Sequence, residues 1–392
     1  MKEFSDIRDE VSEVLHLSAG VEDVATVPMY VEQDRPIVEL DLRGPDGQAR
    51  TVRCLVDTGG GALFITEGVA QELGLTWGQG YEGSQLAPVV LPGASIGGVE
   101  LDREGARVGV WVGPPHDPGR RDEAFLGGQI LARHHVIFDY PNRTFTIDRP
   151  GALVPQGEPV RITYPPVMGF PRLEAKIDGE IVGLLLDTGA ACSMLSSALL
   201  GRLAERHPDW ARTVGAVGTA NMVGNVDPVL TLMRLGAITC GGVRFANPLV
   251  VERHAGNFEE YMTGMMTGPV VGALAGNALK QYRVEIDYAN GVAYFEQLAG
   301  PDPSEMDLVG LVIRADADGG FIISGTASSC GYPAGCVQKG DRLVAIDGRP
   351  VGGLSRPEVL TLLRGVPGER RQLAIERDGQ RVEVTLPVVR VL

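Results

Sequence analysis

The sequence predicts a mainly β protein, built from two copies of one β unit and a smaller α+β unit at the C-terminal end. Short Val, Ile and Leu runs alternate with turns drawn from 53 Gly and 26 Pro, which is typical of β structure. An Asp-Thr-Gly triplet follows an apolar run twice, at Asp57 and at Asp187. At 392 residues the chain is long enough for two or three domains.

The composition excludes several classes of protein. The chain has 35 Lys and Arg and 50 Asp and Glu, which gives a formal charge of −15. We therefore expect no nucleic-acid partner, because proteins that bind nucleic acids concentrate positive charge. A hydrophobic content of 44% excludes a mainly disordered chain. No apolar run reaches membrane-helix length, so no membrane association is expected. The first ten residues lack a signal-peptide pattern, which favours the cytoplasm, or the periplasm or a secreted location if a leader has been removed.

The five cysteines are odd in number and lack the spacing of zinc ligands. We interpret them as reduced thiols that serve as small apolar residues, with a bridge between Cys330 and Cys336 as the alternative. The adjacent His134 and His135 lie on a predicted strand, so their side chains point to opposite faces and do not share a metal. We therefore expect neither a metal nor a cofactor.

The N-terminal part divides into an extension and a first β unit. Residues 1–30 predict an acidic helix followed by a loop, because apolar residues recur at helical spacing. The helix either packs on the exterior or covers the active site as a pro-like segment. Residues 31–150 form the first unit, in which a helix runs from Thr66 to Leu73 and ends at Gly74.

A second β unit repeats the first after a Pro-rich linker at 151–171, which holds one strand at Val160–Tyr164. This unit covers residues 172–299. The apolar run before Asp187 mirrors the run before Asp57, and the closing segments also match. These closing segments are Leu126–Leu131 with Val136–Asn142 in the first unit, and Leu274–Leu279 with Val284–Asn290 in the second.

The third unit, residues 308–392, follows a linker at 300–307 and is expected to fold around its own core. A helix at about Ser355–Arg364 begins with a capping box made by Ser355 and Glu358. Two closing strands are joined by the turn pair Asp378-Gly379.

The two Asp-Thr-Gly triplets carry the chemistry. A carboxylate at a strand end, followed by Gly, can be presented in a tight loop, and the Thr hydroxyl can tie that loop to a twin. If the two loops meet, Asp57 and Asp187 cannot both ionise, so one holds a proton while the other acts as a base. The alternative is a pair of surface turns, in which Asp and Gly are favoured, but two triplets at matching points of a repeat argue against it.

Residues 31–298 resemble retropepsin-type aspartic protease domains, with an apolar strand, the Asp-Thr-Gly loop, a short helix and a later apolar-apolar-Gly segment in each copy. Because both copies lie in one chain, the resemblance implies a pepsin-like bilobal monomer that hydrolyses polypeptides. It implies that the two aspartates are catalytic and that the neighbouring residues support them. The catalytic residues are Asp57 and Asp187, and the supporting residues are Thr58, Gly59, Thr188 and Gly189.

One segment departs from that family pattern, and the position of the flaps has more than one candidate. Phe125-Leu126-Gly127 matches the later segment, whereas Ala273-Leu274-Ala275 has Ala in the place of Gly. Candidate flaps are Gly80–Val90 and Val217–Val226, and Tyr81 is either a flap aromatic or a half-buried strand residue.

Residues 308–390 resemble a bacterial PDZ domain, through the run Gly340–Gly348 and the helix that follows it. Such domains bind a peptide as an added strand, which we expect between the strand Phe321–Ser324 and the helix Ser355–Arg364. The alternative role is a structural cap on the protease.

The function expected from the sequence is therefore a metal-independent aspartic endopeptidase whose PDZ unit docks substrate or regulates access. The alternative is a catalytically inactive peptide-binding protein, to which Ala275 lends support. An Asp-nucleophile phosphotransferase lacks the further carboxylates and Lys that would hold Mg²⁺ and phosphate.

Overall fold

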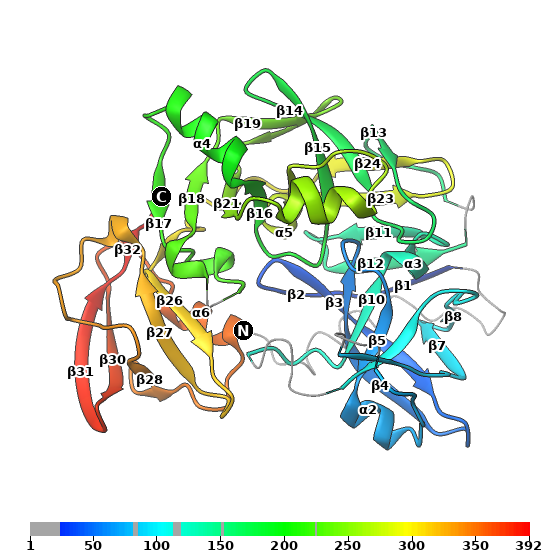
Figure 1. Ribbon diagram of the computed structural model, residues 1–392, viewed down its shortest axis with the longest axis horizontal. Coiled ribbons are helices and arrows are strands. Elements are labelled where there is room, and N and C mark those ends of the chain that lie inside the picture. Colours follow the sequence, from blue (N-terminus) through cyan, green and yellow to red (C-terminus); the bar gives the residue numbers. More distant parts are fainter. Residues whose placement is uncertain (1–23, 81–84, 113–118, 150–152, 224–225) are drawn as a thin grey trace.

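The computed structural model describes residues 24–80, 85–112, 119–149, 153–223 and 226–392. These residues form a mainly β protein with three visible parts (Figure 1). None of the helices within the described ranges is long and apolar enough to cross a membrane.

The first β unit is built on a nine-stranded sheet of order β6-β9-β5-β10-β4-β3-β7-β8, with β2 paired to β3. The predicted helix is confirmed as α2, and Gly74 follows it with a φ of +64°, a left-handed conformation that Gly adopts at low cost. The elements are β1 (Val24–Pro28), β2 (Tyr30–Glu32), β3 (Arg35–Arg43), β4 (Ala49–Asp57), β5 (Leu63–Thr66), α2 (Glu67–Glu72), β6 (Leu86–Pro88), β7 (Gly93–Ile96), β8 (Val99–Glu100), β9 (Val108–Trp111), β10 (Ala124–Gly127), α3 (Gly128–Leu131), β11 (His135–Asp139) and β12 (Thr144–Asp148).

The second β unit repeats the order of strands around its Asp loop, with a longer helix, α4, whose N-terminus is capped by the Ser196 hydroxyl. Its elements are β13 (Glu158–Thr163), β14 (Arg172–Ile177), β15 (Glu180–Asp187), β16 (Ser193–Ser196), α4 (Ser197–Arg206), β17 (Arg212–Val214), η1 (Gly218–Ala220), η2 (Asp227–Val229), β18 (Thr231–Arg234), β19 (Ala237–Cys240), β20 (Val243–Ala246), β21 (Leu249–Arg253), η3 (Asn257–Met262), η4 (Thr263–Met265), β22 (Gly272–Ala275), α5 (Gly276–Leu279), β23 (Tyr282–Asp287) and β24 (Val292–Gln297).

The two β units are joined through a shared run of six strands, in the order β1-β12-β11-β23-β24-β13. The central pair, β11 and β23, is antiparallel, and each unit contributes three corresponding strands on its own side. At this junction the His135 ring lies 2.7 Å from the Glu285 carboxylate, and both side chains are buried. The repeat seen in the sequence is thus arranged about a local twofold between β11 and β23.

The structure corrects one expectation for the segments outside the units and confirms another. Residues 1–23 lie outside the described residues, but Val24–Pro28, predicted as helix or loop, is a strand that pairs with β12. The linker at 151–171 contains β13, which pairs with both β24 and β14. Val24–Pro28 becomes a strand because a partner distant in sequence offers it hydrogen bonds, which no local pattern reveals. The strand in the linker agrees with the one predicted at Val160–Tyr164.

The third unit is a six-stranded sheet of order β26-β27-β28-β30-β31, with β29 beside β28, and one helix, α6. The predicted helix is confirmed, with Ser355 as its N-cap in a capping box with Glu358. Its elements are β25 (Asp307–Leu308), β26 (Leu311–Ala315), β27 (Phe321–Thr326), η5 (Ser328–Cys330), β28 (Arg342–Ile346), β29 (Arg349–Pro350), α6 (Arg356–Leu363), β30 (Arg370–Arg377), β31 (Gln380–Pro387) and β32 (Val389–Arg390).

The third unit does not stand apart as a tethered domain. It has its own apolar core around Phe321 and Leu363. A second apolar cluster, however, joins residues of the second β unit to Leu308, Val312 and Val391 of the third. The expected core is therefore present, but part of the apolar surface of the third unit also packs against the second β unit, whose strands β17 and β18 lie beside it (Figure 1).

The five cysteines are free thiols in the structure. Cys54, Cys192 and Cys240 are buried, and burial raises their pKa values well above the ordinary value, as expected for small apolar residues in a core.

Candidate functional site

The two Asp loops occupy equivalent places in the two units. Asp57 ends β4 and pairs in parallel register with Gly127 of β10, and Asp187 ends β15 and pairs with Ala275 of β22. The correspondence between Gly127 and Ala275 that the sequence suggested is confirmed by this register. Both aspartates are half-buried.

The two loops are tied together by their threonines. The Thr58 hydroxyl donates to the Leu186 carbonyl at 2.6 Å and accepts from the Thr188 N–H at 3.0 Å. The Thr188 hydroxyl donates to the Val56 carbonyl at 2.8 Å and accepts from the Thr58 N–H at 3.1 Å. Both threonines are fully buried. These four reciprocal hydrogen bonds fix one loop against the other.

The glycines of the triplets let each carboxylate approach the opposite loop. A β-carbon built on Gly59 would lie 2.7 Å from Cγ of Asp187, and one built on Gly189 would overlap the Asp57 carboxylate. Only Gly leaves this space open, which is the physical reason for Gly at the third position of both triplets. The structure therefore brings Asp57 and Asp187 together.

A second set of hydrogen bonds repeats in both units. It joins each Asp loop to the residues that follow the neighbouring strand, β10 or β22. The Gly128 N–H donates to the Gly60 carbonyl at 2.5 Å. In the second unit the Gly276 N–H donates to the Ala190 carbonyl at 3.0 Å. Ala275, the departure noted in the sequence, is fully buried, and its N–H donates to the Ser193 hydroxyl at 3.0 Å. The extra methyl group is thus accommodated without loss of the shared pattern.

The electrostatics of the two aspartates differ. Burial, together with the nearby Asp57 charge, raises the pKa of Asp187 to about 8. Burial also raises the pKa of Asp57, while the Gly59 N–H and the positive charges of Arg120 and Arg35 act in the opposite direction. The pair thus favours one proton between two carboxyl groups near neutral pH.

The described parts of the two candidate flaps have different surroundings. In the first unit a bridge between Trp77 and Val89 closes the segment, and Tyr81 lies outside the described residues. In the second unit β17 and β18 form a hairpin. β17 contacts the third unit, where the Thr213 hydroxyl lies 3.1 Å from that of Ser328, and so does the connection, where Asn221 accepts from the Ile313 N–H at 3.2 Å.

The third unit offers a different strand edge from the one expected. β27, which contains Phe321–Ser324, pairs with β26 on one side and β28 on the other, so it has no free edge for a peptide. The outer strand beside β27 is β26, which pairs with no other strand of the described chain. The expected docking position is therefore wrong by one strand, because the sequence pattern does not show which strand of a sheet is outermost.

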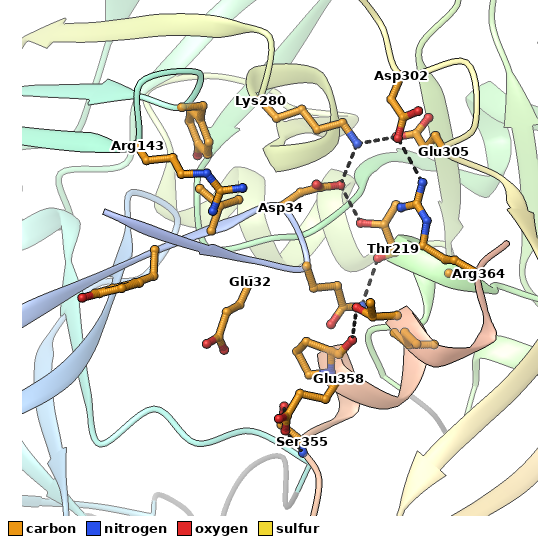
Figure 2. Close-up of a pocket in the computed structure, with 18 of the residues that line it drawn as sticks. Glu32, Asp34, Arg143, Thr219, Lys280, Asp302, Glu305, Ser355, Glu358 and Arg364 are labelled. Atoms are coloured by element: carbon orange, nitrogen blue, oxygen red, sulfur yellow. Dashed lines mark hydrogen bonds and ion pairs between the residues drawn. The ribbon is translucent and has the colours of Figure 1, made fainter. Parts of the chain in front are cut away.

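A cavity of about 1110 Å³ lies where the three units meet. Its wall includes the turn between β2 and β3, helix α6 and an ion-pair cluster in which Lys280 binds Asp34 at 3.2 Å and Glu305 at 3.0 Å (Figure 2). Sequence reasoning missed these residues. The only indication in the sequence was the polar pair Gln33-Asp34, which suits a tight turn. In the structure both residues adopt positive φ angles, 49° and 61°.

Comparison with known proteins finds a PDZ domain at residues 322–377. No curated protein matches the chain significantly. The matched residues lie in the third unit, which therefore contains a PDZ domain. PDZ domains bind peptides, commonly by adding them as a strand to a sheet edge.

Proposed function

We propose that the protein is an aspartic endopeptidase in which Asp57 and Asp187 activate one water molecule. The observation that carries the proposal is the reciprocal tie between Thr58 and Thr188, which sets each carboxylate against the glycine of the opposite loop. In this proposal residues 31–150 and 172–299 are two retropepsin-like lobes of a pepsin-like monomer. The local twofold between β11 and β23 supports that arrangement.

The reaction follows from the difference between the two carboxyl groups. Asp187 holds the shared proton, because its pKa is raised to about 8, and Asp57 is the base. Asp57 takes a proton from the water while the water oxygen bonds to the peptide carbonyl carbon. Asp187 gives its proton to the carbonyl oxygen, and a neutral tetrahedral diol forms.

Breakdown of the diol reverses the two roles. Asp57 returns its proton to the amide nitrogen, the C–N bond breaks, and Asp187 recovers a proton from one diol hydroxyl. The products are a carboxylic acid and an amine, and both aspartates regain their first state. Every proton is held by one of the two aspartates, so the cycle needs no further acid or base.

Peptide binding by the PDZ domain is the second function, and in our proposal it brings polypeptide substrate to the lobes. The family match at residues 322–377 supports peptide binding by itself. If the aspartate pair proves inactive, the protein is a peptide-binding protein with a degenerate protease fold, the alternative that the sequence left open.

The test is the hydrolysis of an unfolded polypeptide, reduced and carboxymethylated α-lactalbumin. We expect wild-type protein to cleave it, and Asp57→Asn or Asp187→Asn to lower the rate at least about a thousandfold, as expected for loss of a general acid or base. Asp41→Asn, an exposed change on β3 in the first unit, is the matched control and should retain the rate. Cleavage retained by either catalytic variant, or absent from wild type, would overturn the proposal.

A further inference from the structure

The outer edge of β26 is already in contact with another part of the chain. The Ile313 N–H donates to the side-chain oxygen of Asn221 at 3.2 Å. Asn221 is fully buried, and its amide nitrogen donates to Asp227 at 2.7 Å. An amide oxygen here occupies the position that the carbonyl of an added strand would take.

The same segment of the second unit also reaches the helix on the other side of this edge. Arg356, the first residue of α6, donates from Nη1 to the Asn221 carbonyl at 3.2 Å and to the Met222 carbonyl at 2.8 Å. Arg356 is only 4% exposed. The segment Gly218–Met222 thus spans from the edge strand to the helix, across the gap in which a peptide strand would lie.

The first unit holds this segment from a third direction. Gln33 donates to the Thr219 carbonyl at 3.2 Å and to the Asn221 carbonyl at 2.9 Å. The Thr219 hydroxyl donates to Asp34 at 2.8 Å (Figure 2). All three units therefore meet on Gly218–Met222, beside the cavity lined by α6.

The start of the edge strand indicates which part of a polypeptide would fit. The Val309 N–H donates to the Leu363 carbonyl, the Leu311 N–H to the Val309 carbonyl, and the Gly310 N–H to the Tyr332 hydroxyl, at 2.7 to 3.0 Å. Capture of a terminal carboxylate needs a nest of backbone N–H groups that are free to donate. Since these donors are already bonded, the site suits an internal segment rather than a chain terminus.

We propose that the gap between β26 and α6 is a docking site for an extended internal segment of an unfolded polypeptide, which Gly218–Met222 fills as an intramolecular ligand in the free protein. A polypeptide that pairs with β26 displaces Asn221 from Ile313. The regulatory consequence rests on the proposed function. Val217 and Ala220 belong to an apolar cluster against which Ala190, the residue after the Asp187 triplet, packs. Displacement of Gly218–Met222 therefore loosens the β17–β18 hairpin, which packs near the catalytic pair. Binding of the polypeptide substrate thereby raises the rate of its own hydrolysis.

The first test measures binding of reduced, carboxymethylated α-lactalbumin to full-length protein carrying Asp57→Asn, so that hydrolysis plays no part. Adding Asn221→Ala weakens the internal ligand, and we expect affinity to rise about tenfold, since the competent state becomes more populated. Arg356→Lys should act in the same direction. The matched control is Arg364→Lys at the other end of α6, where Arg364 binds Asp302 and the Ser304 carbonyl; it should leave affinity unchanged.

The second test follows hydrogen exchange in the same Asp57→Asn protein. Added polypeptide should slow exchange in 311–315 and speed it in 216–222. A synthetic peptide of residues 215–223 should bind the Asn221→Ala protein equally well with a free or an amidated C-terminus. Unchanged affinity in both Asn221→Ala and Arg356→Lys, or a requirement for the free carboxylate, would overturn the docking proposal. Neither result depends on whether the protein hydrolyses peptides.

Discussion

The two Asp loops share one hydrogen-bonding scheme but are supported by different residues. In the first unit a β-carbon on Gly127 would come within 2.6 Å of the Gly60 carbonyl oxygen. In the second unit the equivalent Ala275 carries its methyl group fully buried, and Ser193 bonds both the Ala275 N–H and the side chain of Asn277. The comparison shows that the triplet and its threonines set the geometry of the pair, while the residues below each loop can differ.

The units also differ in charge around the two carboxyl groups. The positive charges of Arg120 and Arg35 act on Asp57. Asp187 feels the negative charge of Asp57 and, more weakly, the positive charge of Arg253. A near-symmetric scaffold thereby gives the two aspartates unequal surroundings, which the proposed acid and base roles require.

The largest expected effect comes from closing the space between the loops. Gly189→Ala places a methyl group where the Asp57 carboxylate lies, so we expect hydrolysis to fall at least about a hundredfold, since displacements near 1 Å have that cost. Initial rates on the unfolded polypeptide measure it. Gly201→Ala, at an exposed helical glycine with open space around it, serves as control. Equal rates for the two variants would show that the loops do not approach as described.

Removal of one threonine hydroxyl should be the next largest effect, and it acts on stability. Thr58→Val keeps the shape but leaves the Thr188 N–H and the Leu186 carbonyl buried without this partner. We expect the free energy of unfolding to fall by about 3 kcal/mol. Thr188→Val should cost a similar amount, and the double variant less than the sum, because both belong to one network. Denaturant titrations measure these values, and strict additivity would argue against a joint network.

Substitution of Gly127 or Ala275, which pair with the two aspartates, should have the smallest effect on the free energy of unfolding, and the two losses should differ. Gly127→Ala presses a methyl group onto the Gly60 and Ala62 carbonyls, so we expect a loss of about 2 kcal/mol. Ala275→Gly removes one buried methyl group and adds chain entropy to the unfolded state, a loss of about 1 kcal/mol. The same titrations compare the two. A larger loss for Ala275→Gly than for Gly127→Ala would contradict the assigned supports.

Local signals predicted much of this fold, and long-range contacts account for the rest. The triplets, the repeat and the capping box at Ser355 depend on neighbouring residues and were visible in the sequence. The strand at Val24–Pro28 forms only because β12 is available as its partner. The hydrogen bond between Asn221 and Ile313 of β26 likewise joins residues that are 92 positions apart. No sequence pattern marks either contact.

The central claim is that Asp57 and Asp187 share one proton, and the most direct measurement is a carbon-13 NMR titration of the aspartate carboxyl groups. Burial and the Asp57 charge raise the pKa of Asp187 to about 8, so it should stay protonated at neutral pH and release its proton near pH 8. In Asp57→Asn protein the neighbouring charge is gone, so the pKa of Asp187 should fall. The hydrolysis rate should decline through the same alkaline range in wild type. Titration of Asp187 at the ordinary aspartate value of 3.8 in the folded protein would contradict the account.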